Sequence, residues 1–399
     1  MQFDCVVAGA GPAGCVSARE LARAGFTVLM LEEHSEIGEP VHCTGIVGEK
    51  LSLIQPVPES CVISRIDKVK VLFPRGNPLI LPTPIKPLLI DRSAFDKHLF
   101  TQAVQAGVKT ITGARVENVT NHENGVTVKY SIGSSEEQVE AGICVIATGA
   151  LSGLPAKLGF SGVEHMYYSA QVEIEIDDVD GIELYPGGEY APGSFAYVVS
   201  VDDSTAKAGL IVKGNIKEKF DAFLNSPMLK PRIKSILHSP VYRLMPLGLP
   251  GKTVDSGIMI VGDAACQLKS TTGGGIYYGI RCAHLLADAV KSAKTQNGFD
   301  YSKLRAYEKN WRREFSFEIG AGIFLRKYLE NRDDKWWEKV SEALLTDEAV
   351  KLVSEYKDFD SHKPFITEFF KRPAILRLLL DFTDFGFFNK KEKNGKNLI

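Results

Sequence analysis

The sequence has little net charge and no long apolar run. Its 47 lysine and arginine residues nearly balance 49 aspartate and glutamate residues, for a formal net charge of −2. This balance argues against nucleic acid as a partner. No stretch reaches the about 18 uninterrupted apolar residues that a membrane-spanning helix needs. A first strand is expected from Phe3, which leaves no room for a signal peptide, so we expect a cytoplasmic protein.

Paired cysteine motifs are also missing. The seven cysteines are scattered along the 399 residues and include no Cys-x-x-Cys pair. Such pairs are typical of zinc and dithiol sites, so we expect neither a metal site nor a disulfide framework. The length allows two or three domains.

The first 32 residues follow the pattern strand, glycine turn, helix, strand, acid. An apolar run from Phe3 leads into Gly9-Ala10-Gly11-Pro12-Ala13-Gly14, and a second apolar run ends at Glu32. Gly9 permits a tight turn, Gly11 lets the backbone approach a pyrophosphate, and Gly14 lets the helix pack on the strand. A glycine turn alone can be structural punctuation, but the complete context predicts a dinucleotide site.

The remaining residues of this unit fit the same ligand. Pro12 and Ala13 open the helix, whose free N–H groups favour a phosphate. Glu32 would accept hydrogen bonds from a ribose, and we include Glu33 beside it. An acid here disfavours the 2′-phosphate of NADP, so this stretch predicts FAD or NAD.

Two further stretches before residue 100 hold candidate site residues. His42 and Cys43 adjoin in a loop, where the plain interpretation is a packed thiol beside a solvated histidine and the functional one is a redox or substrate-side thiol. A helix is predicted over 91–106 with Asp91 or Ser93 as its cap. Arg92 then lies in the first turn, where the helix dipole disfavours a cation, which slightly favours a carboxylate or cofactor phosphate as its partner over an idle surface charge.

Two later strands end in small residues, as a nucleotide-binding sheet requires. The run from Ile143 ends at Thr148-Gly149, and the run from Ile258 ends at Gly262-Asp263. Gly273-Gly274-Gly275-Ile276 then opens a helix. Three glycines at a helix start make sense where backbone passes close to a ligand. Asp263 would accept from ribityl or ribose hydroxyls, and the helix start would favour negative charge.

We predict an α/β fold: a Rossmann-like FAD-binding domain with an inserted antiparallel β-sheet substrate domain and a C-terminal helical region. The FAD-binding part comprises 1–162 with 251–300, the antiparallel part 163–250 and the helical part 301–399. Phe195 and Tyr197, two apart on a predicted strand, face one side and either line an apolar cavity or belong to sheet core. The apolar and basic segment 369–388 would dock on the body or on a membrane surface.

These segments together resemble FAD-dependent oxidoreductases of the glutathione-reductase-like superfamily, in its hydroxylase-like branch. The narrower likeness is to the geranylgeranyl reductase family, which includes archaeal digeranylgeranylglycerophospholipid reductases. It is carried by Glu36-Ile37-Gly38-Glu39-Pro40-Val41-His42-Cys43, by Leu89-Ile90-Asp91-Arg92 with Phe95-Asp96-Lys97, and by Thr272-Gly273-Gly274-Gly275-Ile276.

The resemblance makes FAD the expected cofactor and saturation of isolated C=C bonds in an isoprenoid chain the expected reaction. Reduced FAD would give a hydride to one carbon and a proton would reach the other, with Cys43 or His42 as the assisting group. The expected partners are a prenyl lipid and an electron donor such as ferredoxin, NAD(P)H or another reduced carrier. Contact with a membrane would be peripheral.

Three positions depart from the family pattern. The aromatic stretch Pro-x-x-Tyr-x-Trp-x-Phe-Pro is here Pro192 with Phe195 and Tyr197, followed by Val199-Ser200. Lys269-Ser270 stands where Asp-Pro is common, and Thr148-Gly149 replaces the Asp-Gly of related hydroxylases. Two alternatives stay open: a flavin monooxygenase or halogenase acting on a small aromatic, and a non-catalytic protein that binds FAD and lipid. The sequence lacks the Trp-x-Trp-x-Ile-Pro segment expected of a halogenase.

Overall fold

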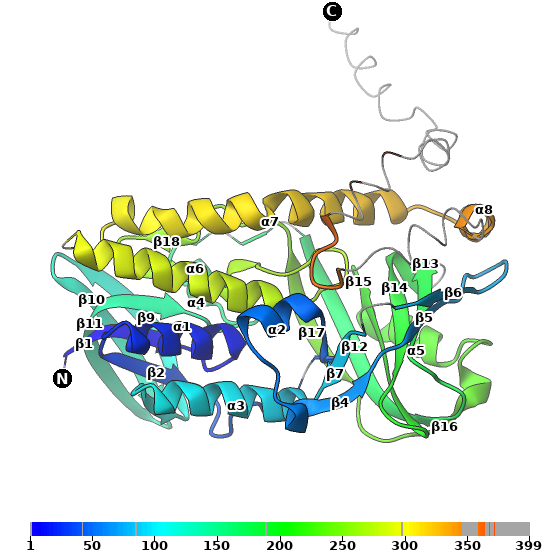
Figure 1. Cartoon of the computed structure of the whole chain (residues 1–399), viewed down its shortest axis with the longest axis horizontal. Helices are drawn as coiled ribbons and strands as arrows, with labels where there is room; N and C mark the ends of the chain where they lie inside the picture. The colour runs from blue at the N-terminus through cyan, green and yellow to red at the C-terminus, as the bar shows by residue number, and fades with distance from the viewer. Residues whose placement is uncertain are drawn as a thin grey trace, which may run out of the picture.

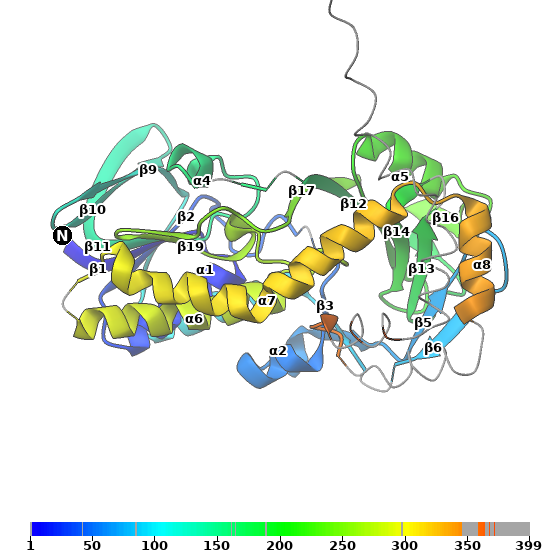
Figure 2. The same ribbon diagram turned by 90° about the horizontal axis from the view of Figure 1, so that it is seen from above.

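The fold contains two large sheets joined by one long helix (Figures 1 and 2). The computed structural model describes residues 2–41, 43–83, 86–160, 162–163, 165–187, 190–296, 298–344, 358–363, 367 and 371. Within the predicted helical region 301–399, residues 345–357 lie outside the described residues, and so does the segment 369–388 except for Lys371.

The first sheet has a parallel centre. Its eight strands are β1 (Gln2–Ala8), β2 (Val28–Glu32), β8 (Lys109–Thr112), β9 (Ala114–His122), β10 (Gly125–Ile132), β11 (Ser135–Ile146), β18 (Val254–Asp255) and β19 (Ile258–Ile260). The order β19-β11-β1-β2-β8 is parallel throughout. An antiparallel meander is formed by β9, β10 and the first half of β11. The Rossmann-like prediction is therefore confirmed.

Both faces of this sheet are covered, which explains why β1 is apolar without alternation. Cys5 and Val7 pack on the side of the helices, whereas Val6 and Ala8 pack under the meander. The helices are α1 (Pro12–Arg23), α3 (Arg92–Gln105), α6 (Ile276–Thr295) and α7 (Tyr301–Leu329), with short α4 (Leu154–Lys157) on the meander side.

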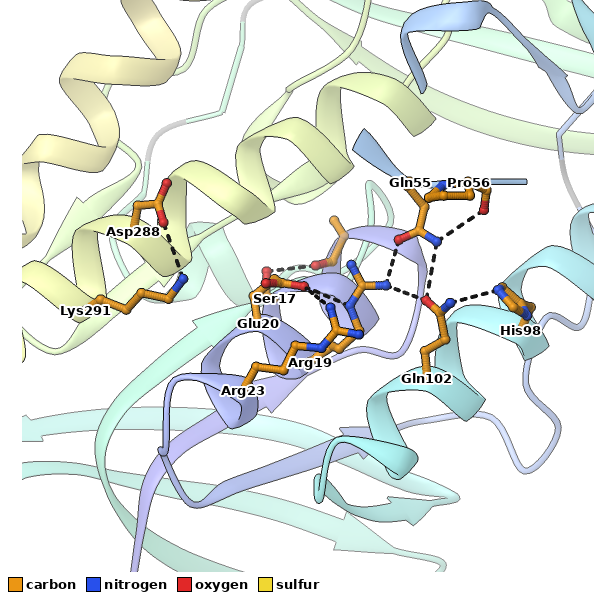
Figure 3. A network of polar contacts seen from close by, with 11 residues as sticks. Ser17, Arg19, Glu20, Arg23, Gln55, Pro56, His98, Gln102, Asp288 and Lys291 are labelled. Carbon is orange, nitrogen blue, oxygen red and sulfur yellow. Dashed lines mark hydrogen bonds and ion pairs between the residues drawn. The ribbon is translucent and has the colours of Figure 1, made fainter. Parts of the chain in front are cut away.

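A buried arginine on α1 links this helix to α2 and α3 through hydrogen bonds (Figure 3). Arg19 of α1 donates to Gln55, which ends α2 (Glu49–Ile54), at 2.7 Å, and also to Gln102 of α3. Its Nε lies 2.9 Å from Glu20. Because a buried cation must be paired, this network fixes the positions of three helices around the glycine turn.

The second sheet is mostly antiparallel, as predicted. Its eight strands are β5 (Lys68–Val71), β6 (Leu79–Pro82), β12 (His165–Ile176), β13 (Ile182–Gly187), β14 (Ala191–Ser200), β15 (Thr205–Val212), β16 (Ile233–Ile236) and β17 (Val241–Leu247). Helix α5 (Ile216–Leu224) covers one face with Phe220 and Phe223. Strands β5 and β6 come from the part of the chain that sequence analysis assigns to the FAD-binding domain; they join this sheet because β5 pairs with β13.

Smaller elements connect the two sheets. The strands β3 (Ile46–Val47), β4 (Val62–Arg65) and β7 (Leu88–Ile90) form a three-stranded sheet that the sequence did not indicate. Short 3-10 turns are η1 (Glu59–Cys61), η2 (Lys230–Arg232) and η3 (Gly262–Ala265), and the last described helix is α8 (Asp334–Leu344). Helix α7 runs about 43 Å at 1.5 Å per residue and passes from the first sheet to the second (Figure 2).

Candidate functional site

The glycine turn between β1 and α1 has the geometry that the sequence predicts. Gly9 has φ +104°, and a Cβ atom on Gly14 would lie 2.0 Å from the Gly9 carbonyl oxygen. Neither position tolerates a side chain. Gly11 differs, because a Cβ there would meet no atom within 4 Å. The open space at Gly11, next to the start of α1, suits a pyrophosphate.

Glu32 stabilises the glycine turn through a hydrogen bond and also lies next to the proposed ribose position. Its Oε2 accepts from the Ala10 N–H at 2.7 Å, and its Oε1 accepts from the His34 N–H at 2.9 Å. Glu33 is exposed beside it, 3.9 Å from Arg115. Each carboxylate oxygen can accept more than one bond, so Glu32 can still receive a ribose hydroxyl.

The ends of β11 and β19 lie against the same turn. Ala147, which directly follows β11, packs against Gly9. The hydroxyl of the next residue, Thr148, is buried and has no hydrogen-bond partner among the described residues. Gly149 follows with φ +73°. A Cβ on Gly262 would lie 3.0 Å from the Ala13 side chain, so the small residues at the end of β19 let η3 approach α1.

Asp263 lies close to other parts of the protein although its side chain is accessible. The residue is exposed, yet burial raises the pKa of its carboxyl group while Arg92 opposes the rise. A carboxyl group that is accessible to solvent, yet has its pKa raised by burial, must be surrounded by protein on most sides. Gly275 lies beneath it, since a Cβ at that position would be 2.7 Å from Asp263 Oδ1. The end of β19 and the glycine run therefore lie next to each other.

Arg92 has a carboxylate partner in its own helix. Asp91 caps α3 by accepting from the Ala94 N–H at 3.0 Å, and Arg92 contacts both oxygens of Asp96, the closer at 3.0 Å. Burial acts to lower the pKa of Arg92, but Asp96 and then Cys43 raise it above its ordinary value. Cys43 therefore lies beside the Arg92 guanidinium.

The Cys43 loop meets the second sheet through a polar cluster. Thr44 Oγ1 lies 2.8 Å from the Tyr197 hydroxyl, and both groups contact Gln171 Oε1, at 2.9 and 3.1 Å. Burial raises the pKa of Tyr197, Thr44 opposes the rise, and Cys43 adds to it. Cys43 is half-buried between Arg92 and Tyr197. His42 lies outside the described residues.

Phe195 and Tyr197 share one side of β14, as predicted. Their ring centroids are 6.4 Å apart, and both residues are half-buried. Neither belongs to the core beneath α5, which is built from the alternate residues Ala196 and Val198. The two rings therefore face the Cys43 loop rather than the sheet core.

The glycine run is held tightly by its neighbours. Gly273 has φ +75°, and a Cβ there would lie 2.1 Å from Met245 Cε. Lys269 closes the turn, because its N–H donates to the Gly274 carbonyl at 2.9 Å and its carbonyl accepts from the Gly273 N–H at 2.7 Å. Ile276 begins α6 directly afterwards.

Sequence reasoning missed Arg326 of α7, which clamps this turn. Buried Arg326 donates to the carbonyls of Ser270 and Thr271, the latter at 2.9 Å, and to Ser194 Oγ at 2.8 Å. A Cβ on Gly322 would lie 2.9 Å from Ser270 Cβ, so this glycine lets α7 approach. The only sequence signal was a glycine inside a strong helical pattern.

Sequence reasoning also missed the segment Asp358–Lys363. Lys269 Nζ donates to the Phe359 carbonyl at 2.5 Å. Asp360 accepts from the N–H groups of Gly48 and Leu51 at 3.0 and 3.1 Å. Burial lowers the pKa of Lys269, with Asp360 acting against that shift. The segment, orange-red in Figure 1, thus connects the glycine run to α2.

The side chains at this site fit FAD. The glycine turn, the unpartnered Thr148 hydroxyl and Glu32 could hold the adenosine and pyrophosphate end. Asp263 and the start of α6 could hold the ribityl and ring end. Among the described residues no cluster of metal ligands occurs, and no helix of that part is long and apolar enough to cross a membrane.

Comparison with known proteins agrees with this geometry. Residues 3–187 match the pyridine nucleotide-disulphide oxidoreductase family. Digeranylgeranylglycerophospholipid reductase 1 of Methanosphaera stadtmanae is 31% identical over 77% of this chain and 79% of its own. The crystal structure of a geranylgeranyl bacteriochlorophyll reductase-like protein from Thermoplasma acidophilum superposes with a TM-score of 0.81 at 24% identity, covering 95% of this chain and 96% of that one.

The fold alone is shared more widely. The flavin-dependent brominase Bmp2 superposes with a TM-score of 0.71 at 17% identity, covering 93% of this chain and 98% of that one. Sequence similarity therefore decides the family. The chain belongs to the digeranylgeranylglycerophospholipid reductase family of FAD-dependent oxidoreductases.

Proposed function

We propose that this protein saturates C=C bonds in the geranylgeranyl or other isoprenoid chain of a lipid or prenyl precursor. The observation that carries the proposal is the position of Cys43 between Arg92 and Tyr197, where the cofactor-side and sheet-side residues meet. When bound, reduced FAD supplies the hydride for one alkene carbon and is itself oxidised. A proton must reach the other carbon, and an external donor such as ferredoxin, NAD(P)H or another reduced carrier restores the electrons.

The protein's own residues have three tasks in this reaction. Glu32, Asp263 and the two glycine segments hold the cofactor. Phe195 and Tyr197 present ring surface to an apolar chain and help to exclude water. Cys43 is the group we assign to the proton, since it lies in the loop that contacts both Arg92 and the Tyr197 cluster.

A single-turnover experiment tests Cys43. Pre-reduced protein is mixed with a prenyl substrate, and flavin oxidation is followed by absorbance for the wild type, Cys43→Ala and Cys43→Ser. We expect a fall of about 10²- to 10⁴-fold, the usual contribution of a positioned general acid. The matched control is Cys144→Ala, because Cys144 is buried in the first sheet. Unchanged rates in both Cys43 variants would remove this thiol from the mechanism.

Two other functions make different predictions. A monooxygenase or halogenase would show NAD(P)H-driven oxygen consumption stimulated by a small aromatic. A non-catalytic protein would bind prenyl lipid tightly, but lipid would not reoxidise the dithionite-reduced protein. Mass spectrometry of the flavin and lipid that copurify separates the three, and an aromatic metabolite in place of a prenyl chain would contradict our proposal.

The proposed substrate also implies contact with a membrane surface. A long prenyl lipid is almost insoluble in water, so we place the protein peripherally at a membrane surface. Co-sedimentation with vesicles that contain the prenyl lipid, compared with vesicles of saturated lipid, measures this contact.

A further inference from the structure

Arg243 lies on the side of the second sheet that faces the Cys43 loop. Successive residues of a strand alternate between faces. On β17, Tyr242 belongs to the core beneath α5, whereas Met245 packs with Tyr167 and Ile211 on the other side. Arg243 shares the parity of Met245. We call this side the inner face; it comprises Tyr167, Ser169, Gln171, Glu173, Phe195, Tyr197, Lys207, Ile211, Arg243 and Met245.

The pairing register places Arg243 between the two halves of the site. Arg243 is opposite Ser169 on β12, and Met245 is opposite Tyr167. Met245 is the side chain that meets Gly273 of the glycine run. In the other direction along β12, Gln171 follows Ser169 by two residues and bonds Thr44 beside Cys43. Arg243 is thus about 7 Å along its strand from the residue at the glycine run.

The guanidinium of Arg243 has no partner in the described part of the chain. It takes part in no hydrogen bond or ion pair there, and its Nε is buried. Burial lowers its pKa with no acidic group acting on it. Other arginines that are largely withdrawn from solvent have partners: Arg92 contacts Asp96, Arg19 donates to Gln55, and Arg326 donates to three oxygens.

The other charged groups of the inner face are already engaged. Lys207 donates to the Thr44 carbonyl at 3.4 Å. Glu173, opposite Lys207 and two residues beyond Gln171, lies 3.8 Å from His238. A partly buried cation without an acceptor is costly unless a ligand supplies one. A guanidinium also presents paired N–H donors that match two oxygens of a phosphate.

We propose that Arg243 binds the phosphate of the substrate headgroup and makes the enzyme selective for anionic prenyl substrates. This rests on the proposed function and assigns one residue of the second sheet to recognition of the headgroup phosphate. The shared chemistry is a phosphate monoester, diester or diphosphate next to the prenyl chain. A prenyl diphosphate and a prenyl glycerophospholipid both carry it, and the experiment below separates them.

The test compares phosphorylated with neutral substrates. Reoxidation of pre-reduced protein is measured against concentration for geranylgeranyl diphosphate, a digeranylgeranyl glycerophospholipid in detergent, and geranylgeraniol. In Arg243→Gln we expect the half-saturating concentration of the preferred phosphorylated substrate to rise about ten- to hundredfold. This factor corresponds to the free energy of one hydrogen bond to a charged group. Geranylgeraniol should be unaffected, and Arg243→Lys should keep part of the preference.

Controls separate this inference from folding and from the proposed function. Arg65→Gln removes an exposed arginine that pairs with Glu59 and should change nothing. Flavin content and circular dichroism report whether each variant folds. Inorganic diphosphate should compete in the wild type but not in Arg243→Gln. Equal effects on geranylgeraniol and the phosphorylated substrates, or no effect on either, would overturn the role of Arg243. Failure of every prenyl compound to reoxidise the wild type would instead contradict the proposed function. In that case, calorimetric binding of geranylgeranyl diphosphate to the wild type and to Arg243→Gln would still decide the role of Arg243.

Discussion

Replacing Arg326 with methionine should loosen the turn that precedes the glycine run. Arg326 is buried and donates to the carbonyls of Ser270 and Thr271 and to the Ser194 hydroxyl. Methionine retains apolar contact with Tyr167, over whose ring the guanidinium lies at 4.9 Å, but supplies no donor. Buried carbonyls would then lack their partner.

The size of the effect follows from two opposing contributions. Hydrogen bonds to a charged group contribute about 1.5–3 kcal/mol each and are not additive. Burial lowers the pKa of Arg326 to about 10, so the folded protein also carries a desolvation cost for this cation, which methionine removes. We therefore expect a net loss of about 2–4 kcal/mol in the free energy of unfolding, less than the sum of three bonds.

Urea unfolding of the apoprotein and fluorescence titration with FAD measure both consequences. Because Gly273 follows Thr271 by two residues, displacement of the turn should also weaken FAD binding by about tenfold, or 1.4 kcal/mol. The matched control is Arg313→Met, since Arg313 is exposed on the same helix. If both variants unfold at the same urea concentration and bind FAD equally, Arg326 does not position the glycine run.

Four further substitutions separate folding from cofactor binding. Gly11→Ala should leave apoprotein stability within about 1 kcal/mol of the wild type and weaken FAD binding, whereas Gly14→Ala should unfold the protein because its Cβ would lie 2.0 Å from a carbonyl oxygen. Thr148→Val removes a buried hydroxyl that has no partner in the described chain and should stabilise the apoprotein by about 1 kcal/mol while weakening FAD. Asp263→Asn should stabilise the apoprotein at neutral pH, since burial raises the pKa of this carboxyl. The gain in stability should vanish below the unfolded pKa of about 3.9 and grow as pH rises through the folded pKa. Urea unfolding and FAD titration check all four substitutions, at several pH values for Asp263→Asn.

The cofactor end of the fold could be predicted because its signals are local. The turn at Gly9 requires a positive φ, and the strand before it and the acid after it lie within one short unit. The predicted cap of α3 was equally local, since Asp91 accepts from a residue three positions on.

The sheet-side contacts could not be predicted because they depend on pairing between distant strands. Phe195 and Tyr197 were expected on one side of a strand, but nothing in the sequence says which side meets Thr44, 153 residues from Tyr197. A shift of one residue in register would have turned both rings into the core. Arg243 was missed for the same reason, because its place next to Ser169 exists only in the paired sheet.

Contacts from α7 and from Phe359 account for one departure from the family pattern. The resemblance expects Asp-Pro ahead of the glycine run, and a proline there would fix the backbone of the turn locally. This chain has Lys269-Ser270, which supplies no such restriction. The structure restrains the same turn from a distance: Arg326 holds the carbonyls of Ser270 and Thr271, and Lys269 is anchored to the Phe359 carbonyl.

A turn held by tertiary contacts depends on elements that follow it in the chain. Glu318 of α7 accepts from the Ser361 hydroxyl at 2.8 Å and from the His362 N–H at 2.6 Å, so α7 also fixes the segment that anchors Lys269. Loss of α7 contacts would therefore disturb the glycine run even though the whole FAD fingerprint remained intact. For this reason α7 and the segment Asp358–Lys363 help to fix the conformation of the glycine run.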